Sequence, residues 1–135
     1  MTVLRRKTRT CKIGDLCVGS EFPVRIQTMT MGKTENVKKC IAEIKTVENE
    51  ADLIRVAIPN FEAAKAILEI KSGINMPLVA DIHFDPRLAI AALDYGADKI
   101  RINPGNFFDK SYLDKVINLA RKKNAAIRIG VNAGS

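Results

Sequence analysis

The sequence feature that most constrains the fold is a short pattern in which an arginine stands between two β-branched residues. It occurs four times, as VRI, IRV, IRI and IRI, at residues 24–26, 54–56, 100–102 and 127–129. Successive residues of a β-strand point to opposite faces, so each copy sends its Val and Ile side chains one way and its arginine the other. Helices cover both faces of a doubly wound sheet, where buried arginines are hard to satisfy, whereas the lumen of a βα barrel is a polar place for them. The pattern therefore predicts part of a βα barrel.

The segments around these copies predict alternating strands and helices. Strands are expected at residues 24–28, 53–58, 78–83, 99–103 and 127–132. Apolar residues at spacings of three and four predict helices from about residues 34, 60, 85 and 111, and Leu68 is expected on the apolar face of the second. The Asp85-Pro86 pair is expected to open the third helix, and a capping box from Ser111 to Asp114 the fourth.

Five strands alternating with four helices predict an α/β fold with a parallel sheet and right-handed crossovers. A complete (β/α)8 TIM-type barrel has eight strands over about 250 residues, so we expect a partial barrel. A β-hairpin is expected before it, because the Gly-Asp pair within residues 10–20 suits a tight turn that would set Cys11 opposite Val18 rather than Cys17. The chain thus divides into a basic tail and hairpin at 1–20 and the first part of a barrel at 21–135.

Charge and composition narrow the class of protein. The net charge is +7, and five basic residues precede the first acidic residue, Asp15. Such a tail can bind nucleic acid, but the chain has no tryptophan and no aromatic residues interleaved with these bases, which favours a solvated terminus. No apolar run approaches the ~18 residues of a membrane span, and no secretory leader is evident. From the tail and the apolar runs we therefore expect neither a nucleic-acid nor a membrane partner. Because the three cysteines form neither a C-x-x-C pair nor a zinc ligand set, we expect a reduced cytoplasmic protein with no metal ligands.

Polar residues are predicted to converge at the carboxyl ends of the strands, where βα barrels hold their active sites. Strand parity places on the inward face Arg55, Asp81, His83, Arg101, Asn103, Arg128 and Asn132. Three arginines expected at one level of the sheet suit a ligand with several negative groups, because guanidinium forks match phosphate oxygens. The alternative is that these arginines pair with acids such as Asp81 inside a packed barrel.

Two further features bear on this site. The turns at 103–106 and 132–135 contain glycine and can direct backbone N–H groups toward an anion. His83, the single histidine, lies two residues after Asp81 on the same predicted face, and the pair can orient substrate hydroxyls or move a proton. We therefore expect His83 and Asp81 to be catalytic residues. The chain contains neither a G-x-G-x-x-G motif nor a Walker loop, so these residues alone name no reaction.

Four blocks of the chain carry a resemblance. PVRIQTMT at 23–30, LVADIHF at 78–84, RINPGN at 101–106 and RIGVNAGS at 128–135 closely resemble the 4-hydroxy-3-methylbut-2-enyl diphosphate synthase family of isoprenoid biosynthesis. The resemblance implies a barrel that binds 2-C-methyl-D-erythritol 2,4-cyclodiphosphate and a separate C-terminal domain with a [4Fe–4S] cluster. It also implies an oxidoreductase that works as a homodimer and receives electrons from flavodoxin or ferredoxin in the methylerythritol phosphate pathway.

The resemblance also assigns roles by position. It implies that Arg55, Arg101 and Arg128 bind the diphosphate and that Asp81, His83, Asn103 and Asn132 line the substrate pocket. Arg25 and Thr28 depart from the family's usual residues, and Cys11, Cys17 and Cys40 do not match the cluster cysteines. We therefore expect a substrate-binding fragment that lacks the iron–sulfur domain and does not turn over by itself. Two other hypotheses stay open, a non-catalytic module that binds a phosphate ligand and a nucleic-acid-binding protein that uses the basic tail.

Overall fold

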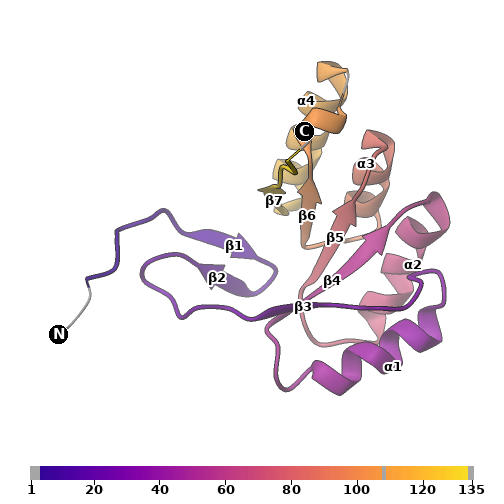
Figure 1. The fold of residues 1–135 in the computed structure, drawn as a ribbon, viewed down its shortest axis with the longest axis horizontal. Helices are drawn as coiled ribbons and strands as arrows, with labels where there is room; N and C mark the ends of the chain where they lie inside the picture. The colour runs from indigo at the N-terminus through magenta and orange to yellow at the C-terminus, as the bar shows by residue number, and fades with distance from the viewer. Residues whose placement is uncertain (1–3, 108, 134–135) are drawn as a thin grey trace.

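A computed structural model describes residues 4–107 and 109–133 of the chain. Its main element is a five-stranded parallel sheet in the order β3-β4-β5-β6-β7, formed by Gln27–Met29, Leu53–Ile58, Leu78–Ile82, Lys99–Ile102 and Ala126–Ile129. The connections are α1 (Val37–Val47), α2 (Phe61–Ser72), α3 (Pro86–Asp94), the short 3-10 turn η1 (Pro104–Asn106) and α4 (Lys110–Lys123). The strands lie in the sheet in the same order as in the chain, so each βα unit adds the next parallel strand to the wall of a partial barrel (Figure 1).

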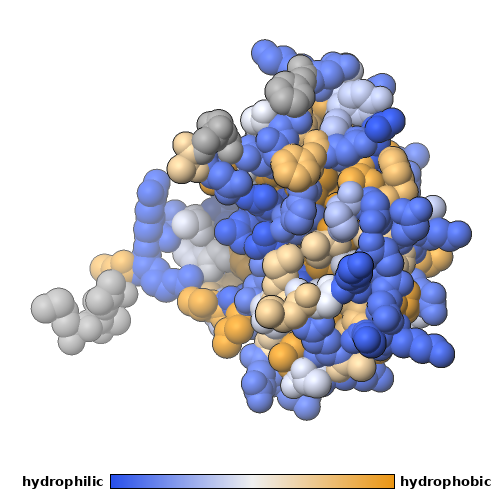
Figure 2. Space-filling view, turned by 45° about the vertical axis from the view of Figure 1, so that its right-hand side comes forward, coloured by the Kyte–Doolittle hydropathy of each residue, from blue (hydrophilic) through white to orange (hydrophobic). Residues whose placement is uncertain are grey.

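The outer face of the sheet packs against the four helices. Ile54, Val56, Ile58, Ile100 and Ile102 are all buried there, in one cluster with the apolar faces of the helices. These are the β-branched neighbours of Arg55 and Arg101, so the predicted division into an apolar outer face and a polar inner face is confirmed for β4 and β6. On β7 it holds less well, because Ile129 is exposed. Figure 2 shows that the surface on the helical side of the molecule is largely hydrophilic, with smaller hydrophobic patches among the hydrophilic residues.

A β-hairpin covers the lower part of the inner face. Strands β1 (Cys11–Ile13) and β2 (Leu16–Val18) pair antiparallel with Cys11 opposite Val18, which confirms the predicted register. Ile13 packs in a second buried cluster with Leu53, Val79 and Ala126, the inward residues near the start of their strands. The hairpin therefore closes the amino-terminal end of the sheet and leaves the carboxyl end open.

The helix starts follow from side-chain caps. Asn36, Asn60, Asp85 and Asp109 each accept a hydrogen bond from a backbone N–H in the first turn of the helix that follows. The predicted Asp85-Pro86 start is confirmed, whereas the capping box at Ser111 is wrong. Asp109 is the cap residue, and its carboxylate accepts from the Ser111 N–H at 2.8 Å. An extended backbone at Asp109 brings its carboxylate over the first turn, so the helix begins earlier than the pattern suggested.

The first predicted strand is shorter than expected. Only Gln27–Met29 pairs with β4, and both Val24 and Ile26 are exposed. The reason is that β4 begins at Leu53, while the N–H of Ile26 donates to the Asp52 carboxylate at 2.8 Å instead of to a strand. Leu68 is also exposed, against expectation, since α2 turns it away from the sheet. Of the helices in the described ranges, none is both long and apolar enough to cross a membrane.

Candidate functional site

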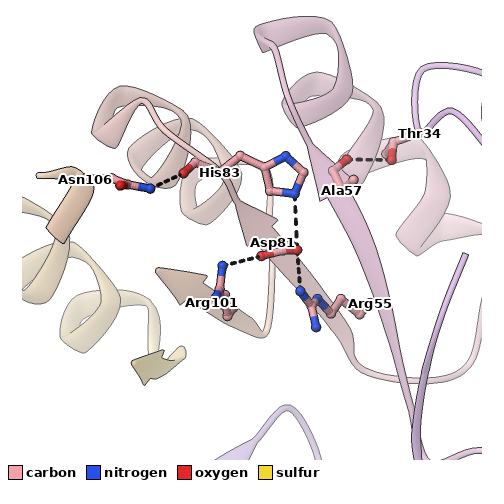
Figure 3. A network of polar contacts seen from close by, with 7 residues as sticks. All are labelled: Thr34, Arg55, Ala57, Asp81, His83, Arg101 and Asn106. Atoms are coloured by element: carbon pink, nitrogen blue, oxygen red, sulfur yellow. Dashed lines mark hydrogen bonds and ion pairs between the residues drawn. The ribbon is translucent and has the colours of Figure 1, made fainter. Parts of the chain in front are cut away.

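The centre of the candidate site is the carboxylate of Asp81, on the inward face of β5. Its side chain is 3% exposed. Arg55 from β4, His83 from the end of β5 and Arg101 from β6 surround it (Figure 3). Arg55 Nη2 donates to Asp81 Oδ2 at 2.5 Å, His83 Nε2 lies 3.3 Å from the same oxygen, and Arg101 Nη1 lies 3.6 Å from Oδ1. The side chains of Arg55, Arg101 and His83 are 26%, 16% and 39% exposed, so the cluster opens toward solvent on one side.

The strand register shows how these groups reach one another. Asp81 stands beside Ala57 on one side and Arg101 on the other, and Arg101 stands beside Arg128. Arg55 stands beside Val79, one inward position lower than Asp81. The prediction that the three arginines share one level is therefore wrong for Arg55, which reaches up diagonally. Neighbouring strands of a barrel are staggered, and parity within a strand carries no information about that stagger.

His83 follows the last residue of β5 and is held from two sides. Its ring faces Asp81, and its backbone carbonyl accepts a hydrogen bond of 2.7 Å from the Asn106 side-chain amide at the end of η1 (Figure 3). The exposed Phe84 ring lies edge-on to the imidazole, with 6.1 Å between centroids. The single histidine thus has a fixed main chain and an accessible ring beside a buried carboxylate, a geometry suited to moving or holding a proton.

Asn103 is buried, and its side chain shapes the loop after β6. Its Oδ1 accepts from the Gly105 N–H at 3.0 Å, and its carbonyl accepts from the Asn106 N–H at 3.0 Å. These N–H groups are used within the loop, so the prediction that the 103–106 turn directs them toward an anion is wrong. The turn at 132–135 was predicted to do the same, but its residues 134–135 lie outside the described part of the chain.

Arg128 and Asn132 lie at the edge of the cluster. Arg128 is exposed on β7, level with Arg101, and within residues 4–107 and 109–133 it forms no ion pair. Asn132 is exposed three residues beyond the end of β7. The structure therefore brings Arg55, Asp81, His83 and Arg101 together, with Arg128 beside Arg101 on the neighbouring strand and Asn132 in the segment after β7.

The inward face is strongly cationic. It carries Arg55, Lys99, Arg101 and Arg128 against the single carboxylate of Asp81. Burial lowers the pKa of Lys99, and the nearby charge of Arg128 lowers it further. Sequence reasoning missed Lys99, although it lies two residues before Arg101 and the same parity rule would have found it. An uncompensated positive face of this kind attracts and holds anions.

Ligands for a metal or an iron–sulfur cluster do not converge in the described residues. No three His, Cys, Asp or Glu side chains of residues 4–107 and 109–133 are arranged to hold a metal ion. Cys11 and Cys17 are free thiols on the hairpin, and Cys40 is buried in α1, where burial raises the pKa of its thiol to about 11. Since cluster ligation requires thiolates that point to one centre, these residues do not fit a [4Fe–4S] group.

Comparison with known proteins agrees with this architecture. The family model described as the GcpE TIM-barrel domain matches residues 8–135. A protein of Caldanaerobacter subterraneus subsp. tengcongensis named 4-hydroxy-3-methylbut-2-en-1-yl diphosphate synthase (flavodoxin) is 51% identical over 136 residues, covering 100% of this chain and 38% of that protein. Proteins of Bacillus cytotoxicus and Bacillus anthracis with the same name are each 50% identical over 132 residues, covering 97% of this chain and 36% of theirs. The chain thus spans little more than a third of the length of these relatives.

Proposed function

This chain belongs to the GcpE TIM-barrel family, and we propose that it is the substrate-binding barrel segment of a 4-hydroxy-3-methylbut-2-en-1-yl diphosphate synthase. The reaction is the reductive conversion of 2-C-methyl-D-erythritol 2,4-cyclodiphosphate to 4-hydroxy-3-methylbut-2-enyl diphosphate in isoprenoid biosynthesis. One observation carries the proposal: at the open end of the sheet Arg55 and Arg101 meet the buried carboxylate of Asp81, and Arg128 stands beside Arg101 on the neighbouring strand. Such a surface suits a small ligand with two phosphate groups.

In this proposal Arg55, Arg101 and Arg128 bind the diphosphate. A guanidinium has five N–H donors, and Asp81 takes only one of those on Arg55, so most donors stay available to phosphate oxygens. Asp81 holds Arg55 and Arg101 in place by its charge while leaving the site net positive. Arg128 adds a third cation from the neighbouring strand.

Asp81 and His83 are the proposed catalytic residues. The imidazole is the most exposed of the three groups around Asp81, and the carboxylate at 3.3 Å orients it. We propose that this pair orients a substrate hydroxyl and transfers a proton to it as water is eliminated. Asn103 and Asn132 complete the pocket wall, the first by shaping the loop after β6 and the second from the segment after β7.

The electron-transfer part of the reaction is assigned outside this chain. The names of the relatives specify flavodoxin as a partner, and we propose flavodoxin, with ferredoxin as the alternative, as the donor to a [4Fe–4S] cluster held by the further length of the synthase. The free thiols of residues 4–107 and 109–133 do not converge on one centre and do not fit that cluster. We also propose that the whole synthase is a cytoplasmic homodimer, in keeping with the free cysteines of this segment.

A segment exchange tests the proposal. The matching segment of the Caldanaerobacter synthase is replaced by this chain, the hybrid is reconstituted with its cluster, and reductive turnover of the cyclodiphosphate is measured. We expect turnover in the hybrid, and Arg101→Ala should raise KM and lower kcat, with kcat/KM reduced by about 10- to 150-fold, or roughly 1.5–3 kcal/mol.

The matched control is Arg121→Ala, which removes an exposed arginine from the last turn of α4 and should leave kcat/KM unchanged. An inactive hybrid that still binds the cyclodiphosphate would favour the non-catalytic phosphate-binding module. Unchanged kcat/KM in the Arg101 variant would contradict the assigned site.

A further inference from the structure

Gly130 stands directly after β7, opposite the side chain of Arg101 on β6. Its N–H donates to the Ile102 carbonyl at 2.9 Å, so its backbone is held in place by the neighbouring strand. Among the described glycines, positive φ occurs at Gly14, Gly19 and Gly96 and not at Gly130. The backbone at Gly130 is therefore one that alanine can adopt. The reason for a glycine here is therefore the space around it and not its conformational freedom.

That space is occupied by one edge of the Arg101 guanidinium. A Cβ atom added at Gly130 would lie 2.5 Å from Nε, 2.9 Å from Nη2 and 3.0 Å from Cζ of Arg101. It would lie closest to the two nitrogens and farthest from the carbon between them, which places it in front of the Nε–Nη2 edge. This edge is one of the two that bind a pair of phosphate or carboxylate oxygens in bidentate fashion.

The opposite end of the same guanidinium is already engaged. Arg101 Nη1 lies 3.6 Å from Asp81 Oδ1, an oxygen that is buried and accepts no hydrogen bond within the described residues. In the described part of the chain, Nε and Nη2 of Arg101 have no hydrogen-bond acceptor. The side chain is nevertheless mostly buried, so its position is set by Asp81 on one side and by the bare backbone of Gly130 on the other.

From this geometry we propose that Gly130 is a positioning residue that keeps the Nε–Nη2 edge of Arg101 open to a pair of phosphate oxygens. A side chain at this position pushes the guanidinium away from Asp81 or blocks the edge where the oxygens bind. The inference rests on the proposed function for the identity of the ligand, a diphosphate ester, but its steric part applies to any oxyanion with the same spacing.

A double-mutant cycle on the 135-residue chain tests it. Binding of inorganic diphosphate and of 2-C-methyl-D-erythritol 2,4-cyclodiphosphate is titrated for the wild type, Gly130→Ala, Arg101→Ala and the double variant. We expect Gly130→Ala to weaken binding of both anions by about tenfold to a hundredfold, the loss of a charge-assisted bidentate contact. Arg101→Ala should weaken it by at least as much. The double variant should bind no more weakly than Arg101→Ala alone, because the added methyl group then has no guanidinium to displace.

Stability measurements keep the test decisive where a variant folds poorly. The matched control is Gly73→Ala, whose Cβ would lie 2.7 Å from Ile41 Cδ1, a clash of similar severity in an apolar contact. It should lower stability and leave anion affinity unchanged. If Gly130→Ala unfolds, the double variant should recover the stability of Arg101→Ala, and a failure to recover would overturn the inference.

The remaining outcomes separate the two proposals. If Gly130→Ala binds both anions as the wild type does while Arg101→Ala does not, the positioning role is wrong and the proposed function stands. If the wild type binds inorganic diphosphate but not the cyclodiphosphate, the proposed function is wrong, and the cycle on inorganic diphosphate still decides the role of Gly130. Absence of binding to either anion would overturn both.

Discussion

Replacing Asp81 by asparagine should lower the free energy of unfolding far more than the loss of one exposed surface charge does. The amide keeps the size of the side chain but removes the one carboxylate that faces Arg55 at 2.5 Å, His83 at 3.3 Å and Arg101 at 3.6 Å. Removing one partner of a fully buried ion pair typically costs about 3–5 kcal/mol, and this range is an upper limit for the cost of Asp81→Asn. Arg55 and Arg101 are partly exposed and can turn toward the open side of the sheet, which reduces the cost. We expect the free energy of unfolding to fall by roughly 2–3 kcal/mol.

Urea unfolding followed by circular dichroism measures this difference, with the m-value checked for constancy. The control is Asp94→Asn, which removes an exposed pair with Lys123 at 3.6 Å and should change the free energy of unfolding by no more than about 0.5 kcal/mol. In a double variant with Arg55→Met, part of the loss should be recovered, because the unpaired guanidinium nearest the amide is gone. A cost for Asp81→Asn that equals the Asp94→Asn cost would refute the argument that this carboxylate organises the cluster.

Three further predictions follow from single groups. His83→Ala should keep the free energy of unfolding within about 1 kcal/mol of wild type and abolish turnover in the hybrid synthase, whereas a low melting temperature with normal turnover would point to a purely structural histidine. Asn106→Ala should lower the free energy of unfolding by about 0.5–1.5 kcal/mol through loss of the 2.7 Å bond to the His83 carbonyl, and an unchanged His83 NMR signal would argue against that bond. Iodoacetamide at pH 8 should label Cys11 and Cys17 but not Cys40, because burial raises the pKa of Cys40 from 9.0 to about 11. Since the folded state holds the Cys40 proton more tightly, the stability that the buried thiol contributes should decline as the pH rises from 9 toward 11. Labelling of all three cysteines in the native chain would contradict the expected protection of Cys40.

Some features of this protein follow from its sequence alone. Successive residues of a strand point to opposite faces, so the inner position of Arg55 and Arg101 and the outer position of their β-branched neighbours could be predicted from the sequence. The hairpin register and the Asp85-Pro86 helix start are likewise local, because each depends on residues a few positions apart. A resemblance carried by four sequence blocks named the same family that the comparison with known proteins found.

Other features were decided only by the tertiary structure. The register between β4 and β5 put Arg55 one inward position below Asp81, and the pairing of β3 with β4 only over Gln27–Met29 left Val24 and Ile26 outside the strand and exposed. The space in front of Arg101 depends on Gly130, which follows the neighbouring strand β7. Periodicity along one strand says which face a side chain takes, but the stagger between strands is set by how the intervening helices pack on the sheet, and that packing involves residues far apart in the chain.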